Sequence, residues 1–272
     1  MTLQSDHLVQ VFPSKEGVLN AYHKETPLIE VNDLIQQLGT QEVLRGLSLS
    51  VYQGETMVLL GPSGGGKSVF LRHLIGLMRP LSGEIFIDGK DISRLTERRL
   101  EPVRRKIGML FQDGALFDSM NVFENVAFPL FERGERDPKR LREKVARALD
   151  LVSLSGQEEK MPVNLSGGMR KRTALARAII SEPTCILYDE PTAGLDPIVS
   201  DTINRLIRRL QKQLHVTSIV VTHDMTSANH IADRVALMHQ GRIHFCGTLQ
   251  QFHASRDPLL RDFIEGRSHE ID

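Results

Sequence analysis

A glycine-rich loop between an apolar strand and a helical segment is the feature that most constrains the fold of this chain. The loop reads Gly61-Pro62-Ser63-Gly64-Gly65-Gly66-Lys67-Ser68 and fits the pattern G-x-x-x-x-G-K-S. An apolar run at 56–60 precedes it and a segment of helical periodicity at 69–77 follows it. Backbone amides of such a loop turn toward phosphate oxygens, and the helix N-terminus attracts the anion. The sequence predicts nucleotide binding here, rather than a Gly/Ser-rich surface loop.

The last two residues of the loop carry predicted chemistry. Lys67 would reach the β- and γ-phosphates, and the Ser68 hydroxyl would ligate Mg2+. A carboxylate pair, Asp189-Glu190, ends a second apolar run at 185–188. Ligands bind at the carboxyl edge of parallel strands, so Asp189 is expected to hold the Mg2+ shell and Glu190 to polarise water. A solvated strand end is the alternative for the pair alone, and the phosphate loop favours the functional assignment.

Two further polar residues follow apolar strands and are expected at the same sheet edge. Gln112 follows the strand at 107–111, and His223 follows the strand at 219–222. A glutamine there can position water or complete the metal shell, and a histidine can hydrogen-bond the γ-phosphate. A structural or solvated histidine is the alternative, because the chain has ten His.

A second glycine turn, Leu165-Ser166-Gly167-Gly168-Met169, precedes a long basic helix. A hydroxyl, two glycines and a helix N-terminus make another anion site. Because the chain already has one phosphate site, Ser166, Gly167 and Gly168 are expected to cap the γ-phosphate held by a second copy. An ordinary helix N-cap is the simpler alternative, and both can hold together.

The pattern of the chain predicts an α/β fold with a mainly parallel sheet, because strands alternate with helices. A helical stretch from 121 to about 154 is expected to be interrupted at Pro129 and Pro138. Lys+Arg and Asp+Glu are both 34, so no basic excess points to nucleic acid. No apolar run approaches the length of about 20 residues that spans a bilayer, and no signal-peptide pattern opens the chain. Cys185 and Cys246 are expected to be buried fillers of strands, as suits a reducing compartment.

The order of these motifs resembles the ATP-binding subunits of ABC transporters over residues 28–250. The matching positions are 61–68, Gln112, 165–169, 186–190, Gly194-Leu195-Asp196 and His223. The resemblance implies a P-loop ABC ATPase fold with an antiparallel N-terminal β subdomain and an inserted helical subdomain at about 113–181. It implies ATP and Mg2+ as cofactors and a head-to-tail dimer that encloses two ATP molecules.

The resemblance also assigns roles to residues. It implies that Lys67, Gln112, Glu190 and His223 are catalytic. It implies that Ser68, Gln112 and Asp189 hold the metal. Residues 1–27 would be an N-terminal extension and residues 251–272 a C-terminal helical tail.

A finer resemblance covers the stretch Phe111-Gln112-Asp113-Gly114-Ala115-Leu116-Phe117, residues 120–130, the stretch Asn164 to Met169, and the tail from 257 to 266. These look like Mla-type ATPases, which drive phospholipid transport for outer-membrane lipid asymmetry. That family implies a membrane permease, an MCE-domain lipid-binding protein and a STAS-domain protein as partners. It also implies a place at the cytoplasmic face of the inner membrane.

Two positions depart from the wider family. An aromatic residue that stacks on adenine is common before the phosphate loop, and Leu38 stands there, so the base contact is expected to be aliphatic. The fifth signature residue is commonly Gln, and it is Met169 here, as in Mla-type sequences.

Three alternatives to lipid transport stay open. They are a soluble, non-transport ABC ATPase, a catalytically dead regulatory cassette, and the ATPase of a polar-solute importer. For the tail, the stripe Leu259, Leu260, Phe263 and Ile264 predicts a helix that packs either on its own domain or on a neighbouring subunit.

Overall fold

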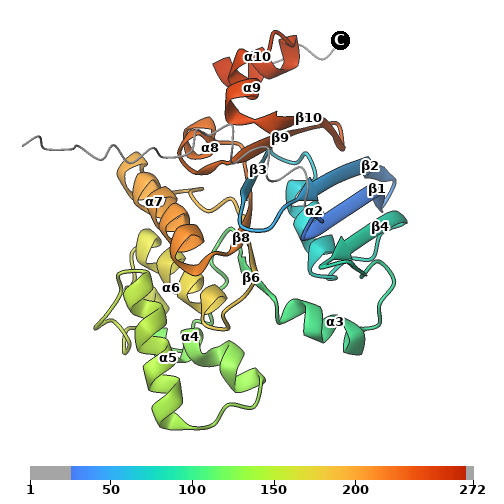
Figure 1. The fold of residues 1–272 in the computed structure, drawn as a ribbon. Helices are drawn as coiled ribbons and strands as arrows, with labels where there is room; N and C mark the ends of the chain where they lie inside the picture. The colour runs from blue at the N-terminus through green and yellow to red at the C-terminus, as the bar shows by residue number, and fades with distance from the viewer. Residues whose placement is uncertain (1–25, 268–272) are drawn as a thin grey trace, which may run out of the picture.

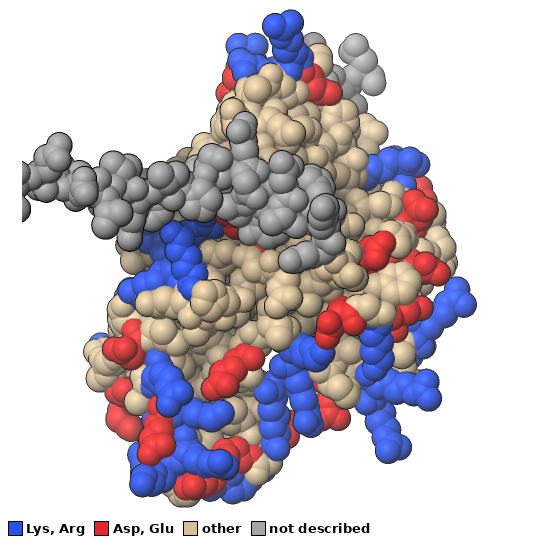
Figure 2. Space-filling view, viewed as in Figure 1, with Lys and Arg blue, Asp and Glu red and all other residues tan. Residues whose placement is uncertain are grey.

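The computed structural model describes residues 26–267 and places two β-sheets side by side with helices around them (Figure 1). All but two residues of the expected N-terminal extension, and the end of the expected tail, lie outside the described residues. Both signs of charge alternate over the helical part at the bottom of the molecule (Figure 2).

The smaller sheet is antiparallel and holds four strands. Its order is β2 (Gln41–Val51), β1 (Ile29–Leu38), β4 (Ser82–Ile87) and β5 (Lys90–Asp91). Buried residues recur at alternate positions along β1 and β2, which is the pattern of a sheet with one face on a core. The expected antiparallel N-terminal β subdomain is confirmed.

The larger sheet carries the phosphate loop on a central strand. Its order is β10 (Arg242–Thr248), β9 (Arg234–His239), β3 (Thr56–Leu60), β8 (Thr217–Thr222), β7 (Cys185–Asp189) and β6 (Ile107–Leu110). Neighbours from β9 to β6 pair in parallel, and β10 is an antiparallel edge. The strands β3, β7 and β8 are buried along their whole length, which explains their continuous apolar sequences. The mainly parallel core sheet is confirmed.

Two hydrophobic cores lie on the two faces of this sheet. Met57 and Leu59 of β3 face a core shared with the smaller sheet and with α2 (Lys67–Leu74). Val58 and Leu60 face the opposite core, which a second group of helices covers. These helices include α4 (Val122–Glu132), α5 (Pro138–Leu151), α6 (Gly167–Ile179), α7 (Pro197–Leu214) and α8 (Met225–Ile231). Successive side chains of β3 therefore point alternately into the two cores.

The helices differ from the expectations at several points. The structure adds α3 (Glu97–Arg104) and the short 3-10 helix η1 (Pro162–Asn164). The tail is helical as expected, and it holds two helices, α9 (Leu249–Ala254) and α10 (Pro258–Glu265). The expected break at Pro129 is wrong, because α4 runs through it, held by an Asn121–Glu124 capping box and by buried apolar neighbours. Pro138 does separate two helices, since it opens α5 at a position that needs no N–H.

The structure also shows how far the two cysteines and the tail stripe are buried. Cys185 is buried, but Cys246 is exposed, so the expectation of two buried fillers is wrong for Cys246. The tail stripe packs on the chain's own core, with Leu260 buried and Leu259, Phe263 and Ile264 partly buried. Between residues 26 and 267, no helix combines the length and apolar character needed to cross a bilayer.

Candidate active site

The loop at 61–68 leaves the carboxyl end of β3 and enters α2. Gly64 and Gly66 adopt φ angles of +77° and +97°, which favour glycine. A Cβ on Gly66 would lie 2.9 Å from Val43 Cγ1, so the close packing there excludes a side chain. Within the described chain no side chain caps the first turn of α2, so its amides are available to an anion.

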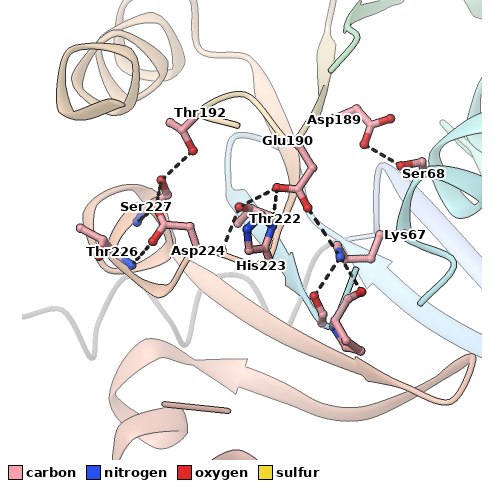
Figure 3. Close-up of polar contacts among 12 residues, drawn as sticks. Lys67, Ser68, Asp189, Glu190, Thr192, Thr222, His223, Asp224, Thr226 and Ser227 are labelled. Atoms are coloured by element: carbon pink, nitrogen blue, oxygen red, sulfur yellow. Dashed lines mark hydrogen bonds and ion pairs between the residues drawn. The ribbon is translucent and has the colours of Figure 1, made fainter. Parts of the chain in front are cut away.

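The Lys67 side chain lies across this loop. Its ammonium donates hydrogen bonds to the carbonyls of Gly61 and Pro62 at 2.8 and 2.9 Å. It also lies 3.6 Å from Glu190 Oε1 (Figure 3). Burial lowers the pKa of Lys67, and the negative charges of Glu190 and Asp189 oppose that shift. A cation on an anion-binding loop is the arrangement that phosphate recognition requires.

Ser68 and Asp189 form the second contact between the loop and the strand ends. The Ser68 hydroxyl donates to Asp189 Oδ1 at 2.8 Å (Figure 3). Burial raises the pKa of Asp189, and the Ser68 hydrogen bond opposes that rise. A hydroxyl beside one carboxylate fits Mg2+, which keeps several waters and takes few protein ligands besides phosphate oxygens. The described residues hold no cluster of three His, Cys, Asp or Glu.

Glu190 is held both by side-chain contacts and by an unusual backbone conformation. Its carboxylate accepts hydrogen bonds from Thr222 Oγ1 at 3.2 Å and interacts with His223 Nδ1 at 3.0 Å (Figure 3). Its backbone is left-handed, with φ +45°. A non-glycine residue keeps that conformation only where its surroundings fix it, and such residues cluster at functional sites.

A cavity of about 380 Å³ brings most of the predicted residues together. Those that line it are Ser63, Gly64, Gly66, Lys67, Ser68, Gln112, Glu190 and His223. Leu38 lies on the same wall with 42% of its surface exposed, beside Gln41 and Val43. The position before the phosphate loop therefore offers an aliphatic surface to whatever occupies the cavity.

The second glycine turn does not line this cavity. Ser166 caps α6, and its hydroxyl accepts a hydrogen bond from the Met169 amide at 3.3 Å. A Cβ on Gly168 would lie 2.7 Å from Val199 Cγ1, so α6 and α7 meet closely there. The N-cap alternative is confirmed. Within one chain, Ser166, Gly167 and Gly168 are not brought to the phosphate loop.

Two residues of this site were not predicted from the sequence. Thr222 ends the apolar strand that precedes His223, and its contact with Glu190 is what marks it as part of the site. Lys171 is buried behind the cavity and bonds the carbonyls of Gln112 and Glu190. Its signal in the sequence was only its place five residues after Ser166, among other basic residues.

Comparison with known proteins agrees with this geometry. Residues 44–193 match the family model described as ABC transporter. The intermembrane phospholipid transport system ATP-binding protein MlaF of Haemophilus influenzae is 42% identical over 89% of this chain and 91% of its own length. The probable ribonucleotide transport ATP-binding protein mkl of Mycobacterium tuberculosis is 43% identical over 88% of this chain and 67% of its own length.

Solved structures are similar as well. The ATP-binding cassette MJ0796, in a dimeric post-hydrolysis state with ADP and Pi, is 30% identical with a TM-score of 0.74. That match covers 81% of this chain and 98% of MJ0796. The cbiO1 protein of Clostridium perfringens, part of an ABC transporter complex, is 30% identical with a TM-score of 0.78 and covers 88% of this chain and 96% of its own.

Proposed function

Because the chain belongs to the ABC transporter family of ATP-binding proteins, we propose that it hydrolyses ATP to move phospholipid between the inner and outer membranes. Such transport would maintain the lipid asymmetry of the outer membrane. The observation that carries the proposal is the cavity where Lys67, Gln112, Glu190 and His223 meet. The lipid class is supported by the likeness to MlaF, which extends over most of both chains.

The residues of the cavity divide the work on ATP. The loop amides and Lys67 hold the β- and γ-phosphates, and this positioning with charge neutralisation supplies most of the rate. Glu190 orients the attacking water. His223, whose ring also contacts the Glu190 carboxylate, hydrogen-bonds the γ-phosphate. Gln112, which follows the carboxyl end of the neighbouring strand β6, positions water.

Ser68, Asp189 and Gln112 would hold Mg2+ in this proposal. When bound, the metal neutralises charge on the β- and γ-phosphate oxygens. The hydrogen bond from Ser68 to Asp189 supports the assignment, because it shows that two oxygen atoms that can ligate a metal already lie side by side.

A second copy of the chain would complete each site. Ser166, Gly167 and Gly168 do not line the cavity of their own chain, and in this proposal they meet the ATP held by a partner. The dimeric state of the MJ0796 cassette supports this arrangement. The protein alone is therefore expected to be a weak ATPase.

The membrane permease would dock beside Gln112, on the loop that leads into α4. Asn125, which is fully buried, holds this loop by accepting from the Phe117 amide and donating to the Phe117, Met120 and Asn121 carbonyls. The Phe117 ring packs on Phe128 with centroids 4.7 Å apart and is 41% exposed. A rigid loop that presents an aromatic ring suits a protein partner.

Other partners follow only from the likeness to Mla-type ATPases. They are an MCE-domain lipid-binding protein and a STAS-domain protein. Docking on the permease would place the ATPase at the cytoplasmic face of the inner membrane.

A polar-solute transporter is the second candidate. The observation that favours it is the mkl relative, which is named for ribonucleotide transport and is as similar to this chain as MlaF is. Purification with its permease, followed by mass spectrometry of bound small molecules, separates the two. Phospholipid in the purified complex would support the lipid proposal, and a polar solute without phospholipid would overturn it.

A further inference from the structure

Lys171 is a buried lysine whose contacts are unusual. It lies on the second turn of α6, and only 6% of its surface is exposed. Its ammonium donates one hydrogen bond to the Gln112 carbonyl and another, at 3.3 Å, to the Glu190 carbonyl. One side chain therefore holds the backbones of two cavity residues that lie 78 positions apart in the sequence.

The charge of Lys171 lacks a close carboxylate. Among the described residues no ion pair within 4.0 Å includes it. Burial lowers the pKa of Lys171, and the carboxylates of Asp113, Asp189 and Glu190 oppose that shift from greater distances. Burying a charged group is costly unless hydrogen bonds offset the lost hydration. The ammonium is thus better suited to fixing two carbonyls than to forming a salt bridge.

The backbone of Glu190 needs such support because it is left-handed. Its amide donates to the Val221 carbonyl at 3.0 Å, and its carbonyl accepts from the Ala193 amide at 3.2 Å as well as from Lys171. These bonds come from β8, from the turn after β7 and from α6. Lys171 is the contact by which α6 takes part in placing Glu190.

We propose that Lys171 is a positioning residue that fixes Gln112 and Glu190 to the helix α6. This inference rests on the proposed function, because Gln112 and Glu190 act on ATP only there. The same helix begins with Gly167 and Gly168, which would meet ATP on a second copy. Lys171 follows one turn later, so α6 connects the nucleotide of one site to the glutamate of the other.

The test compares three variants with the wild-type protein in complex with its permease. Lys171→Met keeps the length and apolar stem and removes the donor. Lys171→Arg keeps a cationic donor. Arg172→Met is the matched control, since Arg172 is the next residue of α6 and donates instead to the Ser153 carbonyl, away from the cavity. Steady-state kcat, the ATP Kd and the unfolding temperature are measured for each.

Lys171→Met should lower kcat about 10- to 100-fold, because misplacement of a catalytic group by up to about 1 Å carries such factors. The ATP Kd should stay within about threefold, since no bond of Lys171 reaches the phosphate loop. Lys171→Arg should recover most of the lost kcat, and Arg172→Met should resemble wild type.

Three results would overturn the role of Lys171 while leaving the proposed function intact. One is unchanged kcat in Lys171→Met. Another is a parallel loss of kcat, ATP binding and unfolding temperature, which marks a purely structural residue. The third is an arginine variant that binds ATP and unfolds like wild type yet recovers no kcat. A wild-type complex without ATPase activity would instead refute the proposed function itself.

Discussion

Replacing Gly168 with alanine separates two reasons for a glycine at that position. The added Cβ would lie 2.7 Å from Val199 Cγ1, which is closer than such atoms approach. Overpacking of this kind costs about 1–3 kcal/mol. Alanine in place of glycine returns up to about 1 kcal/mol of helix propensity. The net loss of stability is therefore about 0–3 kcal/mol.

The rate of hydrolysis should fall much more than a loss of stability of this size would explain. If Gly168 meets the nucleotide of a second copy, a methyl group there obstructs closure of the dimer. We expect kcat to fall about 100-fold or more, as for loss of a transition-state contact. The assay is steady-state phosphate release by the permease complex, with thermal unfolding of the same samples.

The double variant Gly168→Ala, Val199→Ala decides between the two reasons. Trimming Val199 makes room for the new methyl group at a cost of about 1 kcal/mol for the side chain itself. It should relieve the steric part of the destabilisation and leave hydrolysis impaired. Recovery of hydrolysis along with the relieved clash would refute the contact in trans, because packing within one chain would then explain the glycine.

Three further predictions address the cavity and the core. Glu190→Gln should still bind ATP, and its rate of hydrolysis should fall about 100- to 10,000-fold, because the amide keeps the shape of the side chain but not its charge. A wild-type rate of phosphate release would contradict the role of Glu190. Leu38→Tyr should tighten the ATP Kd about 5- to 100-fold, since base stacking on an aromatic ring is worth about 1–3 kcal/mol. Leu77→Tyr, at an exposed leucine outside the cavity, is the control. If calorimetry gave the same change in Kd for both variants, that result would argue against an adenine contact at Leu38. His73 is buried between the Val69 carbonyl and Gln36, and burial lowers its pKa despite the Val69 hydrogen bond. Below about pH 6.5, His73 binds a proton in the unfolded chain more readily than in the folded chain. The free energy of unfolding should therefore decrease as the pH drops below about 6.5. Urea midpoints at pH 7.5 and pH 5.5 should differ less in His73→Gln than in wild type, and equal differences would show that His73 is not responsible.

Local rules explain why much of the site could be predicted from the sequence. The strands β3, β7 and β8 are buried on both faces, so each is a short continuous apolar run whose end is visible in the sequence. Asp189, Glu190 and His223 follow such ends directly, and parallel pairing brings the ends together. The phosphate loop needs no long-range information, because its glycines and helix start are adjacent.

The missed features depend on contacts between distant residues. Lys171 reaches Gln112 across 59 positions, and no pattern in its own helix marks that contact. The helix α3 has only Leu100 and Val103 buried, which is too sparse an apolar pattern to be recognised. The continuation of α4 through Pro129 depends on packing by Val126, Ala127 and Leu130, which outweighs the local preference of proline.

The central claim is that each active site is shared between two copies. Mixing two inactive variants tests it most directly. Lys67→Ala damages only the phosphate loop, and Ser166→Arg damages only the second glycine turn. In a mixed dimer, the loop of one chain and the glycine turn of the other form one undamaged site. We predict that mixing the two variants restores a substantial part of the ATP hydrolysis that each lacks alone. Hydrolysis that stays absent in verified mixed dimers would contradict the shared site.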